Sequence, residues 1–375
     1  MADLFTCVPS VALGRGAFED LGELVSGLGD RALVVTGRGA MRRQGVLDRA
    51  HKLLADAGVQ AACHEGVPPE PRLADVDAAR AAAQEADARV VVGLGGGSAL
   101  DVAKAAAGLL REPERTAHYF HGADLSGNGV PFVGVPTTFG TGTEATENAV
   151  LTDPQARVKK SLRHPGMLAA VAVVDASLGE SAPAPVKAQS GMDALTQAVE
   201  SLMSRHANSL TQSLSLGAAT LLMSSLSAFV RGEGGTESAE NCAAGSLMAG
   251  IALANARLGV VHGVAHPIGL RYSVPHGRVC GVLLPHALRW NRKAASEEYA
   301  LLSSVAGRDV VEFCEELLRT LGLPTDLGEL NVSEADVAPI VAEALPSGSL
   351  QANPRPLSEQ ELAAFVREAC GLARG

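Results

Sequence analysis

Four short runs rich in β-branched residues, each closed by glycine, proline or aspartate, constrain the fold of this chain more than any other feature. The runs lie at 32–36, 89–92, 131–135 and 170–174, and helical sequence separates them. Because such runs lack polar alternation, both faces of each strand must be buried, which is typical of a parallel sheet covered by helices on both sides. The first part of the chain is therefore predicted to be an α/β domain.

The pattern changes soon after Pro183. Apolar residues, among them Leu195 and Leu202, then recur at helical spacing, and no strand is predicted. A chain of 375 residues is also too long for one ordinary core. We therefore predict two domains, an α/β domain at 1–182 and an all-helical domain at 183–375.

Composition narrows the possible partners. The formal charge of −10 argues against a nucleic-acid interface, which needs a basic surface. No run reaches 18 uninterrupted apolar residues, so no membrane span is expected, and the N-terminus lacks the pattern of a signal peptide. The six cysteines have no CxxC spacing, which favours reduced thiols and a cytoplasmic location.

The segment VVVGLGGGSALDVAK (90–104) combines a strand, a glycine-rich turn and a helix. Glycines let backbone N–H groups approach an anion, and a helix N-terminus attracts a phosphate. Ser98 is predicted to cap this helix, with Asp101 three residues later as in a capping box. The pattern departs from GxGxxG because Ser98 replaces the third glycine, and a tight turn without a ligand is the alternative.

A second segment, PTTFGTGTE (136–144), also follows a strand. Its four threonines and two glycines offer hydroxyl groups and open backbone to a nucleotide. A solvent-facing polar turn is the alternative interpretation.

Polar residues also cluster in the helical half. Asp193 and Gln197 are four residues apart on one helix face, as are His262 and His266. His276 follows, so that three of the ten histidines lie within fifteen residues. A single histidine is usually a core residue, but three together indicate a site for metal binding or proton transfer.

Together these segments resemble the iron-containing (group III) alcohol dehydrogenase family of the dehydroquinate synthase-like superfamily. Four motifs carry the resemblance over essentially the whole chain: GGGSALDVAK, PTTFGTGTEATENAVLTD, GMDALTQAVE and LGVVHGVAHPIGLRYSVPHGRVCGVLLPHALRWN. The resemblance implies a dinucleotide-binding α/β domain at 1–182 and a helical catalytic and metal domain at 183–375. It also implies a homodimer that reduces a small aldehyde or ketone to an alcohol with NAD(P)H.

The resemblance further implies roles for individual residues. Those expected at the pyrophosphate turn are Gly95, Gly96, Gly97 and Ser98, together with Asp101. Those expected along the rest of the cofactor are Thr137, Thr138 and Thr141 near the adenine and ribose, and Lys159 near the nicotinamide half. Those expected at the reaction centre are Asn148 facing the substrate, His266 beside substrate and nicotinamide, and the metal ligands Asp193, His262 and His276.

One departure from the family concerns the metal. The family's fourth ligand is a histidine, and Gln197 stands at that position. An amide oxygen is a weaker ligand than imidazole for Fe²⁺ or Zn²⁺. The site then either binds metal loosely, uses water as its fourth ligand, or works without metal as in the related maleylacetate reductases.

A second departure concerns the cofactor. Members that prefer NAD often carry aspartate at the position of Gly37, where it repels a 2′-phosphate. The sequence Gly37-Arg38-Gly39 removes that charge and offers a guanidinium, which favours NADPH or tolerance of both cofactors. The alternative is that Arg38 is an ordinary solvated charge.

The implied chemistry requires an electrophile, because negative charge builds on the carbonyl oxygen. A metal at Asp193, His262 and His276 would polarise the carbonyl. Without metal, His276 or His262 as imidazolium, with Gln197 as donor, would do so; His266 would deliver the proton. A lyase resembling dehydroquinate synthase and a non-catalytic nucleotide-binding relative are the competing hypotheses, and the sequence does not identify the substrate.

Overall fold

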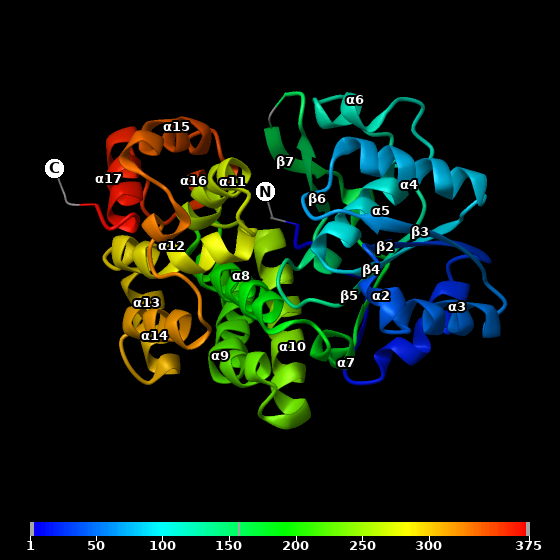
Figure 1. Cartoon of the computed structure of the whole chain (residues 1–375), viewed down its shortest axis with the longest axis horizontal. Helices are drawn as coiled ribbons and strands as arrows, with labels where there is room; N and C mark the ends of the chain where they lie inside the picture. Colours follow the sequence, from blue (N-terminus) through cyan, green and yellow to red (C-terminus); the bar gives the residue numbers. More distant parts are fainter. Residues whose placement is uncertain (1–3, 157, 373–375) are drawn as a thin grey trace. The chain divides into compact units, whose positions relative to one another are not determined.

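The structure is a computed structural model that describes residues 4–156 and 158–372. It divides into two compact units (Figure 1). One unit spans Cys7–Ala182; the other consists of the described residues from Pro183 onward, together with residues 4–6.

The first unit is built on a six-stranded parallel sheet in the order β1-β8-β5-β4-β2-β3. Its strands are β1 (Ser10–Leu13), β2 (Arg31–Gly37), β3 (Gln60–Val67), β4 (Val90–Gly95), β5 (Phe132–Pro136) and β8 (Val171–Val174). The four predicted strands are β2, β4, β5 and β8, and every residue of β4, β5 and β8 is buried. The predicted α/β class with a parallel sheet is confirmed.

Helices cover both faces of this sheet. They are α1 (Leu21–Ser26), α2 (Ala40–Arg43), α3 (Val46–Asp56), α4 (Leu73–Glu85), α5 (Gly97–Leu109), α6 (Thr116–Phe120) and α7 (Ala176–Glu180). Leu47 and Leu54 of α3 share a core with Val92 of β4. The next residue, Gly93, faces the opposite side, where a Cβ on it would lie 2.9 Å from the Cβ of Ala103 in α5.

The strand order places a switch in direction beside β4. The chain passes from β2 to β3 on one side of the sheet, and then through β4, β5 and β8 on the other. In open α/β sheets, ligands bind outside the carboxyl ends of the strands at such a switch point. The carboxyl ends of β2 and β4 are Gly37 and Gly95, which belong to the predicted cofactor segments.

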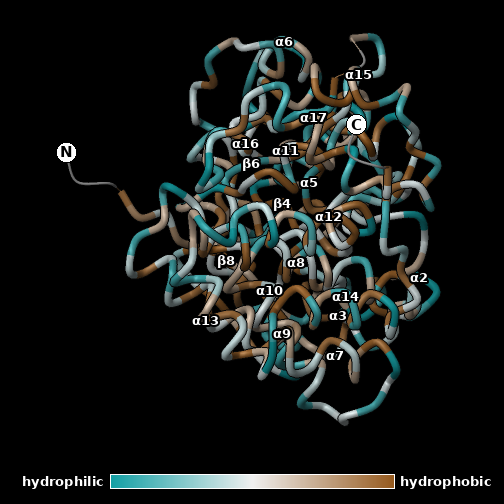
Figure 2. Tube along the Cα trace, turned by 90° about the vertical axis from the view of Figure 1, so that its left-hand side faces the viewer, coloured by the Kyte–Doolittle hydropathy of each residue, from teal (hydrophilic) through white to brown (hydrophobic). Residues whose placement is uncertain are grey.

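The second unit contains helices and, among its described residues, no strand, as predicted (Figure 1). Its helices are α8 (Ala184–Met203), α9 (Ser209–Arg231), α10 (Gly235–Ala256), α11 (Val260–Tyr272), α12 (His276–Asn291), α13 (Ser296–Ala306), α14 (Val310–Thr320), α15 (Glu334–Ala344), α16 (Gly348–Ala352) and α17 (Glu359–Ala369). The traces alternate between hydrophobic and hydrophilic stretches along these helices (Figure 2), which is the pattern of helices that each bury one face.

Helix α9 is long and apolar enough to cross a membrane by length and composition alone. Within the unit it packs against its neighbours. Leu226 fills the space beside Gly191 of α8, and Leu222 contacts the position of Gly245 in α10.

Three parts of the fold were not predicted. Strands β1 and β3 lie at the two edges of the sheet and are only partly buried. The third part is an antiparallel hairpin of β6 (Asn148–Asp153) and β7 (Val158–Arg163). Edge and hairpin strands have solvent on at least one side, so they lack the continuous apolar run used for the prediction.

Candidate active site

The glycine turn of the α/β unit lies at the carboxyl ends of β2 and β4. Gly95 has a φ of +153°, a conformation that favours glycine, and a Cβ there would lie 3.9 Å from the backbone nitrogen of Gly37. Gly39, with φ +79°, donates its N–H to the carbonyl of Gly37 over 2.7 Å. The residues predicted at the pyrophosphate and those predicted at the 2′-phosphate therefore lie next to each other at Gly95 and Gly37.

The threonine segment meets this turn directly. A Cβ on Gly96 would lie 3.2 Å from the Thr138 hydroxyl oxygen, and one on Gly97 would lie 2.6 Å from Thr141 Cγ2. The N–H of Thr137 donates to the carbonyl of Gly95 over 2.9 Å. Two segments forty residues apart in sequence thus come together only because glycine occupies the turn.

The predicted cap of α5 is wrong. The helix begins at Gly97, its N-cap residue is Gly96, and no side chain caps it. Ser98 therefore lies within the first turn, because the flexible glycines let the helix start two residues earlier. The result leaves the first N–H groups of α5 without a side-chain acceptor, as a helix that receives an anion requires.

Lys104, which the sequence analysis did not single out, anchors the threonine segment. Its ammonium is fully buried and donates to the carbonyls of Thr143, Thr146 and Asn148. Burial lowers the pKa of Lys104 to about 8 and raises the pKa of the nearby Asp101 carboxyl to about 7. Asp101 accepts a hydrogen bond of 3.4 Å from the Thr143 hydroxyl, so it supports the turn from inside.

The remaining predicted residues of this unit lie at its surface or in the hairpin. Arg38 is exposed. Lys159 of β7 forms an ion pair with Glu70. The Asn148 amide donates to the Ser161 hydroxyl over 3.4 Å, across the hairpin.

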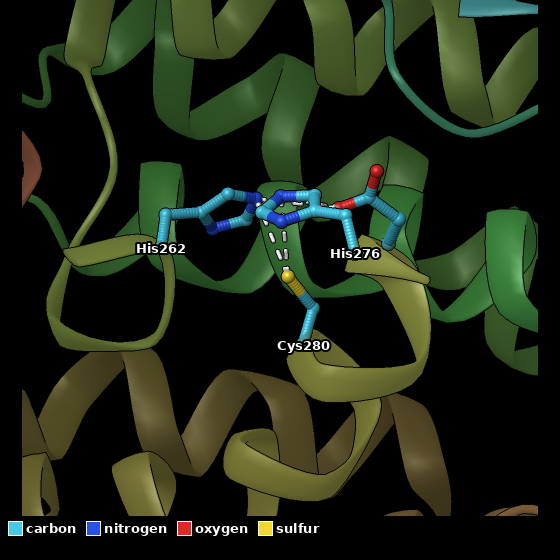
Figure 3. A group of neighbouring side chains, drawn as sticks. His262, His276 and Cys280 are labelled. Carbon is cyan, nitrogen blue, oxygen red and sulfur yellow. Dashed lines mark hydrogen bonds and ion pairs between the residues drawn. The ribbon is translucent and has the colours of Figure 1, made fainter. Parts of the chain in front are cut away.

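In the helical unit, four potential metal ligands converge. Asp193, His262, His276 and Cys280 each offer one donor atom, and these four atoms lie within 4.8 Å of one another. The Asp193 Oδ1 is 3.3 Å from His262 Nε2 and 3.8 Å from His276 Nε2. Figure 3 shows both imidazoles and the Cys280 sulfur pointing toward one another. The structure thus brings the three predicted ligands together and adds Cys280.

Glu200 holds His262 from the side opposite to Asp193. Its carboxylate accepts from His262 Nδ1 over 2.7 Å and from the backbone N–H of Val261 over 2.6 Å. This bond fixes the Nδ1 proton and turns Nε2 toward the other potential ligands, so Nε2 is the atom available to a metal. Glu200 is also 5% exposed, and the N-terminus of α11 stabilises its charge.

The electrostatics of the cluster favour a positive charge at its centre. Burial disfavours the imidazolium form of His262, but the Cys280 sulfur and hydrogen bonds to Asp193, Cys280 and Glu200 outweigh burial and raise its pKa well above the usual value. Burial raises the pKa of the Cys280 thiol to about 12. A cation bound between these donors would displace their protons.

Close helix packing sets the distances within the cluster. A Cβ on Gly277 of α12 would lie 2.2 Å from the carbonyl oxygen of Gln189 in α8 and 3.1 Å from the Asp193 Cβ. A Cβ on Gly259 would lie 2.8 Å from a carboxylate oxygen of Glu200. Glycine at these two positions lets α12 and the start of α11 approach α8.

His266 adjoins the cluster, and Gln197 lies one turn after Asp193 on α8. The His266 ring stacks on the His276 ring, with centroids 4.8 Å apart and planes at 13°. Gln197 is 3% exposed, and its side-chain oxygen has no hydrogen-bond partner among the described residues.

The sequence analysis did not single out Glu200 or Cys280, although spacing could have identified both. Glu200 follows Asp193 by seven residues on α8, and Cys280 follows His276 by four on α12, so each shares a helix face with a predicted ligand.

Replacing Glu200 by glutamine is expected to weaken divalent-metal affinity by about 10- to 100-fold, the usual cost of losing a partner that orients a ligand. An amide NH₂ facing Nδ1 favours the tautomer that carries its proton on Nε2. Competition with a chromophoric chelator measures the affinity. The control is Glu112→Gln, which alters another buried glutamate, one that accepts from Ser126. Equal affinity in Glu200→Gln and the wild type would contradict the orienting role.

Comparison with known proteins agrees with this geometry. Residues 9–176 match the family model for iron-containing alcohol dehydrogenase, and residues 187–370 match the model for the C-terminal part of that family. The chain is 34% identical to the 1,3-propanediol dehydrogenase of Klebsiella pneumoniae, over 96% of this chain and 97% of that protein. It is 31% identical to the NADPH-dependent butanol dehydrogenase of Clostridium saccharobutylicum, over 96% and 95% of the two chains.

A solved structure of a 1,3-propanediol oxidoreductase has the same fold. It matches with a TM-score of 0.94 and 32% identity, over 98% of this chain and all of that chain. The chain therefore belongs to the iron-containing alcohol dehydrogenase family and is an NAD(P)-dependent oxidoreductase of alcohols and small carbonyl compounds.

Proposed function

We propose that this enzyme reduces a short-chain aldehyde to the alcohol with NADPH in preference to NADH, at a divalent metal held by Asp193, His262 and His276. The observation that carries the proposal is the convergence of these three side chains, all from the helical unit, on one point. The names of the relatives, a propanediol and a butanol dehydrogenase, support a short-chain substrate.

The three side chains suit a divalent cation. Tetrahedral Zn²⁺ with nitrogen and oxygen ligands at about 2.0–2.1 Å separates those ligand atoms by about 3.3 Å. The two separations between Asp193 Oδ1 and the histidine nitrogens are 3.3 and 3.8 Å. When bound, the cation would supply a Lewis acid for the carbonyl oxygen.

The protein's own groups then orient and protonate the substrate. Glu200 keeps the Nδ1 proton of His262 in place, so that Nε2 can act as a ligand. We assign to His266, which stacks on His276 and is partly exposed, the delivery of a proton to the carbonyl oxygen. Asn148 is assigned to the substrate side through its amide, which now bonds to Ser161.

We assign the cofactor to the α/β unit. Its pyrophosphate would lie on the N–H groups of Gly95, Gly96, Gly97 and Ser98 at the N-terminus of α5, a position suited to an anion. Thr137, Thr138 and Thr141 would line the adenosine side, with Lys159 toward the nicotinamide, which supplies the hydride. Asp101 would act from inside the turn through Thr143.

Consumption of NADPH or NADH with propanal, butanal and 3-hydroxypropanal tests the function. We expect turnover with at least one aldehyde, with loss after chelation and recovery with added metal. A lyase would convert its substrate without net change in cofactor absorbance, and a binding-only relative would give no turnover. Turnover that survives complete removal of metal would contradict the metal-assisted form of the proposal.

The preference for NADPH rests on Arg38. It is exposed beside Gly37, and a Cβ at Gly37 would lie 3.8 Å from the Val67 carbonyl oxygen, an ordinary contact distance. In the same assay, Arg38→Ala is expected to raise KM for NADPH about tenfold, the loss of one charge-assisted hydrogen bond of about 1.5 kcal/mol, and to leave KM for NADH nearly unchanged. Equal effects on both cofactors would contradict this role.

We further propose a cytoplasmic homodimer. All six cysteines are free, as in proteins of a reducing compartment. Strand β1 is an edge of the sheet whose Val11 and Leu13 side chains are 38% and 51% exposed, and an exposed apolar edge strand favours pairing with a second chain.

A further inference from the structure

The metal centre proposed above contains one donor with no assigned role, the thiol of Cys280. This residue is fully buried, and its Sγ lies 3.5 Å from His276 Nε2 and 3.9 Å from His262 Nε2. It follows His276 by four residues and so lies one turn further along the same face of α12. Figure 3 shows the sulfur directed at the space between the two rings.

We propose that Cys280 is the fourth protein ligand of the metal, and that it completes with Asp193, His262 and His276 a donor set suited to Zn²⁺. The inference rests on the metal site of the proposed function and specifies its composition. Gln197 of α8 stands where the family has its fourth ligand, a histidine. In the proposed site, Cys280 of α12 supplies the fourth ligand instead.

Distances support a site with four protein ligands, a number that still allows a fifth ligand during the reaction. With Zn–N of about 2.0–2.1 Å and Zn–S of about 2.3 Å, a tetrahedral site separates nitrogen from sulfur by about 3.6 Å. The two such separations here are 3.5 and 3.9 Å. All four donor atoms lie within 4.8 Å of one another, so small side-chain movements suffice to bring all four to bonding distance from one metal ion.

The charges of the ligands and the softness of the thiolate also favour zinc. Asp193 as carboxylate and Cys280 as thiolate supply two negative charges, which balance a divalent cation in a buried site. Coordination by a metal deprotonates a thiol outright, so the raised pKa of Cys280 is no obstacle. Soft thiolate ligands favour Zn²⁺, whereas oxygen ligands favour Mg²⁺ and Mn²⁺.

Gln197 is the rival for the fourth position. Its buried side-chain oxygen has no partner among the described residues, and it lies one turn after Asp193 on α8. A thiolate and an amide oxygen differ in a property that spectroscopy detects, because only sulfur gives an intense charge-transfer absorption with Co²⁺ in the near ultraviolet. The two ligands can therefore be distinguished without measuring activity.

The test uses the full-length protein loaded with Co²⁺ alone. We expect the thiolate-to-Co²⁺ band in the wild type and in Gln197→Ala, and its loss in Cys280→Ser and Cys280→Ala. In chelator competition, Cys280→Ser should bind Zn²⁺ about 100-fold more weakly, since structural zinc affinity is shared among four ligands. Gln197→Ala should change the affinity less than tenfold.

Several results would overturn the inference: a Co²⁺-loaded wild type without the band, a band that persists in Cys280→Ser, or loss of zinc affinity only in Gln197→Ala. The wild-type spectrum remains decisive even if the cysteine variants fail to fold. Aldehyde-dependent NADPH consumption without the band would refute the ligand set alone, whereas the band without any turnover would refute the proposed function alone.

Discussion

Asp193→Asn is expected to lower kcat/KM for aldehyde reduction by about 10²–10³-fold, because a Lewis acid contributes several kcal/mol to a charged transition state and each 1.36 kcal/mol is tenfold in rate. Asp193 is 3% exposed and is the oxygen donor of the cluster, within 3.3 and 3.8 Å of the two histidine nitrogens. An amide in its place removes one of the negative charges that attract the metal.

Bound metal, measured by elemental analysis after dialysis, should fall together with the rate. The matched control is Asp309→Asn, which removes the same charge in the same unit. Asp309 caps α14 by accepting from the Val311 N–H, and asparagine caps a helix about equally well. A variant Asp193→Asn that retains full metal content and normal turnover would refute the role of this carboxylate.

Lys104→Met is expected to destabilise the protein by about 3–5 kcal/mol, the usual effect of breaking a buried ionic interaction from one side. The substitution removes the ammonium that donates to the carbonyls of Thr143, Thr146 and Asn148. It also leaves the buried carboxyl of Asp101 without the charge that lowers its pKa.

Thermal unfolding followed by circular dichroism measures the effect, and a loss near 10 °C corresponds to this energy at about 2–4 °C per kcal/mol. The control is Lys52→Met in α3, where the lysine is 74% exposed and forms an i,i+4 pair with Asp56 worth about 0.3–0.5 kcal/mol. The double variant Asp101→Asn, Lys104→Met should recover part of the loss. A change below about 1 kcal/mol in Lys104→Met would show that the buried ammonium is dispensable.

Sequence patterns predicted the parts of the fold that depend on continuous burial. The strands β2, β4, β5 and β8 have no solvent face and so leave a clear apolar run. The edge strand β3, with the sequence QAACHEGV, carries polar residues on partly exposed positions and leaves no such run. The cap of α5 was misplaced because glycine allows several helix starts, and the sequence does not say which one the packing selects.

Only part of the candidate site was predicted, because some of its residues are recognisable only once the helix boundaries are known. Asp193, His262 and His276 are identified by residue type and by family resemblance. Glu200 and Cys280 are recognisable only when their helix face is known. The start of α12 at His276 decides that Cys280 faces the same way as the histidine, and helix ends are the least predictable feature of a sequence.

The geometry of the proposed metal centre depends on the close approach of α12 to α8 at Gly277. A methyl group at this position would contact the Gln189 carbonyl oxygen at 2.2 Å, so any side chain there forces the two helices apart. His276 and Cys280 belong to α12 and Asp193 belongs to α8. Such a shift would therefore lengthen the distances from Asp193 to the other two side chains. We therefore expect the affinity and selectivity of the proposed metal centre to depend also on Gly277, although this residue has no donor atom.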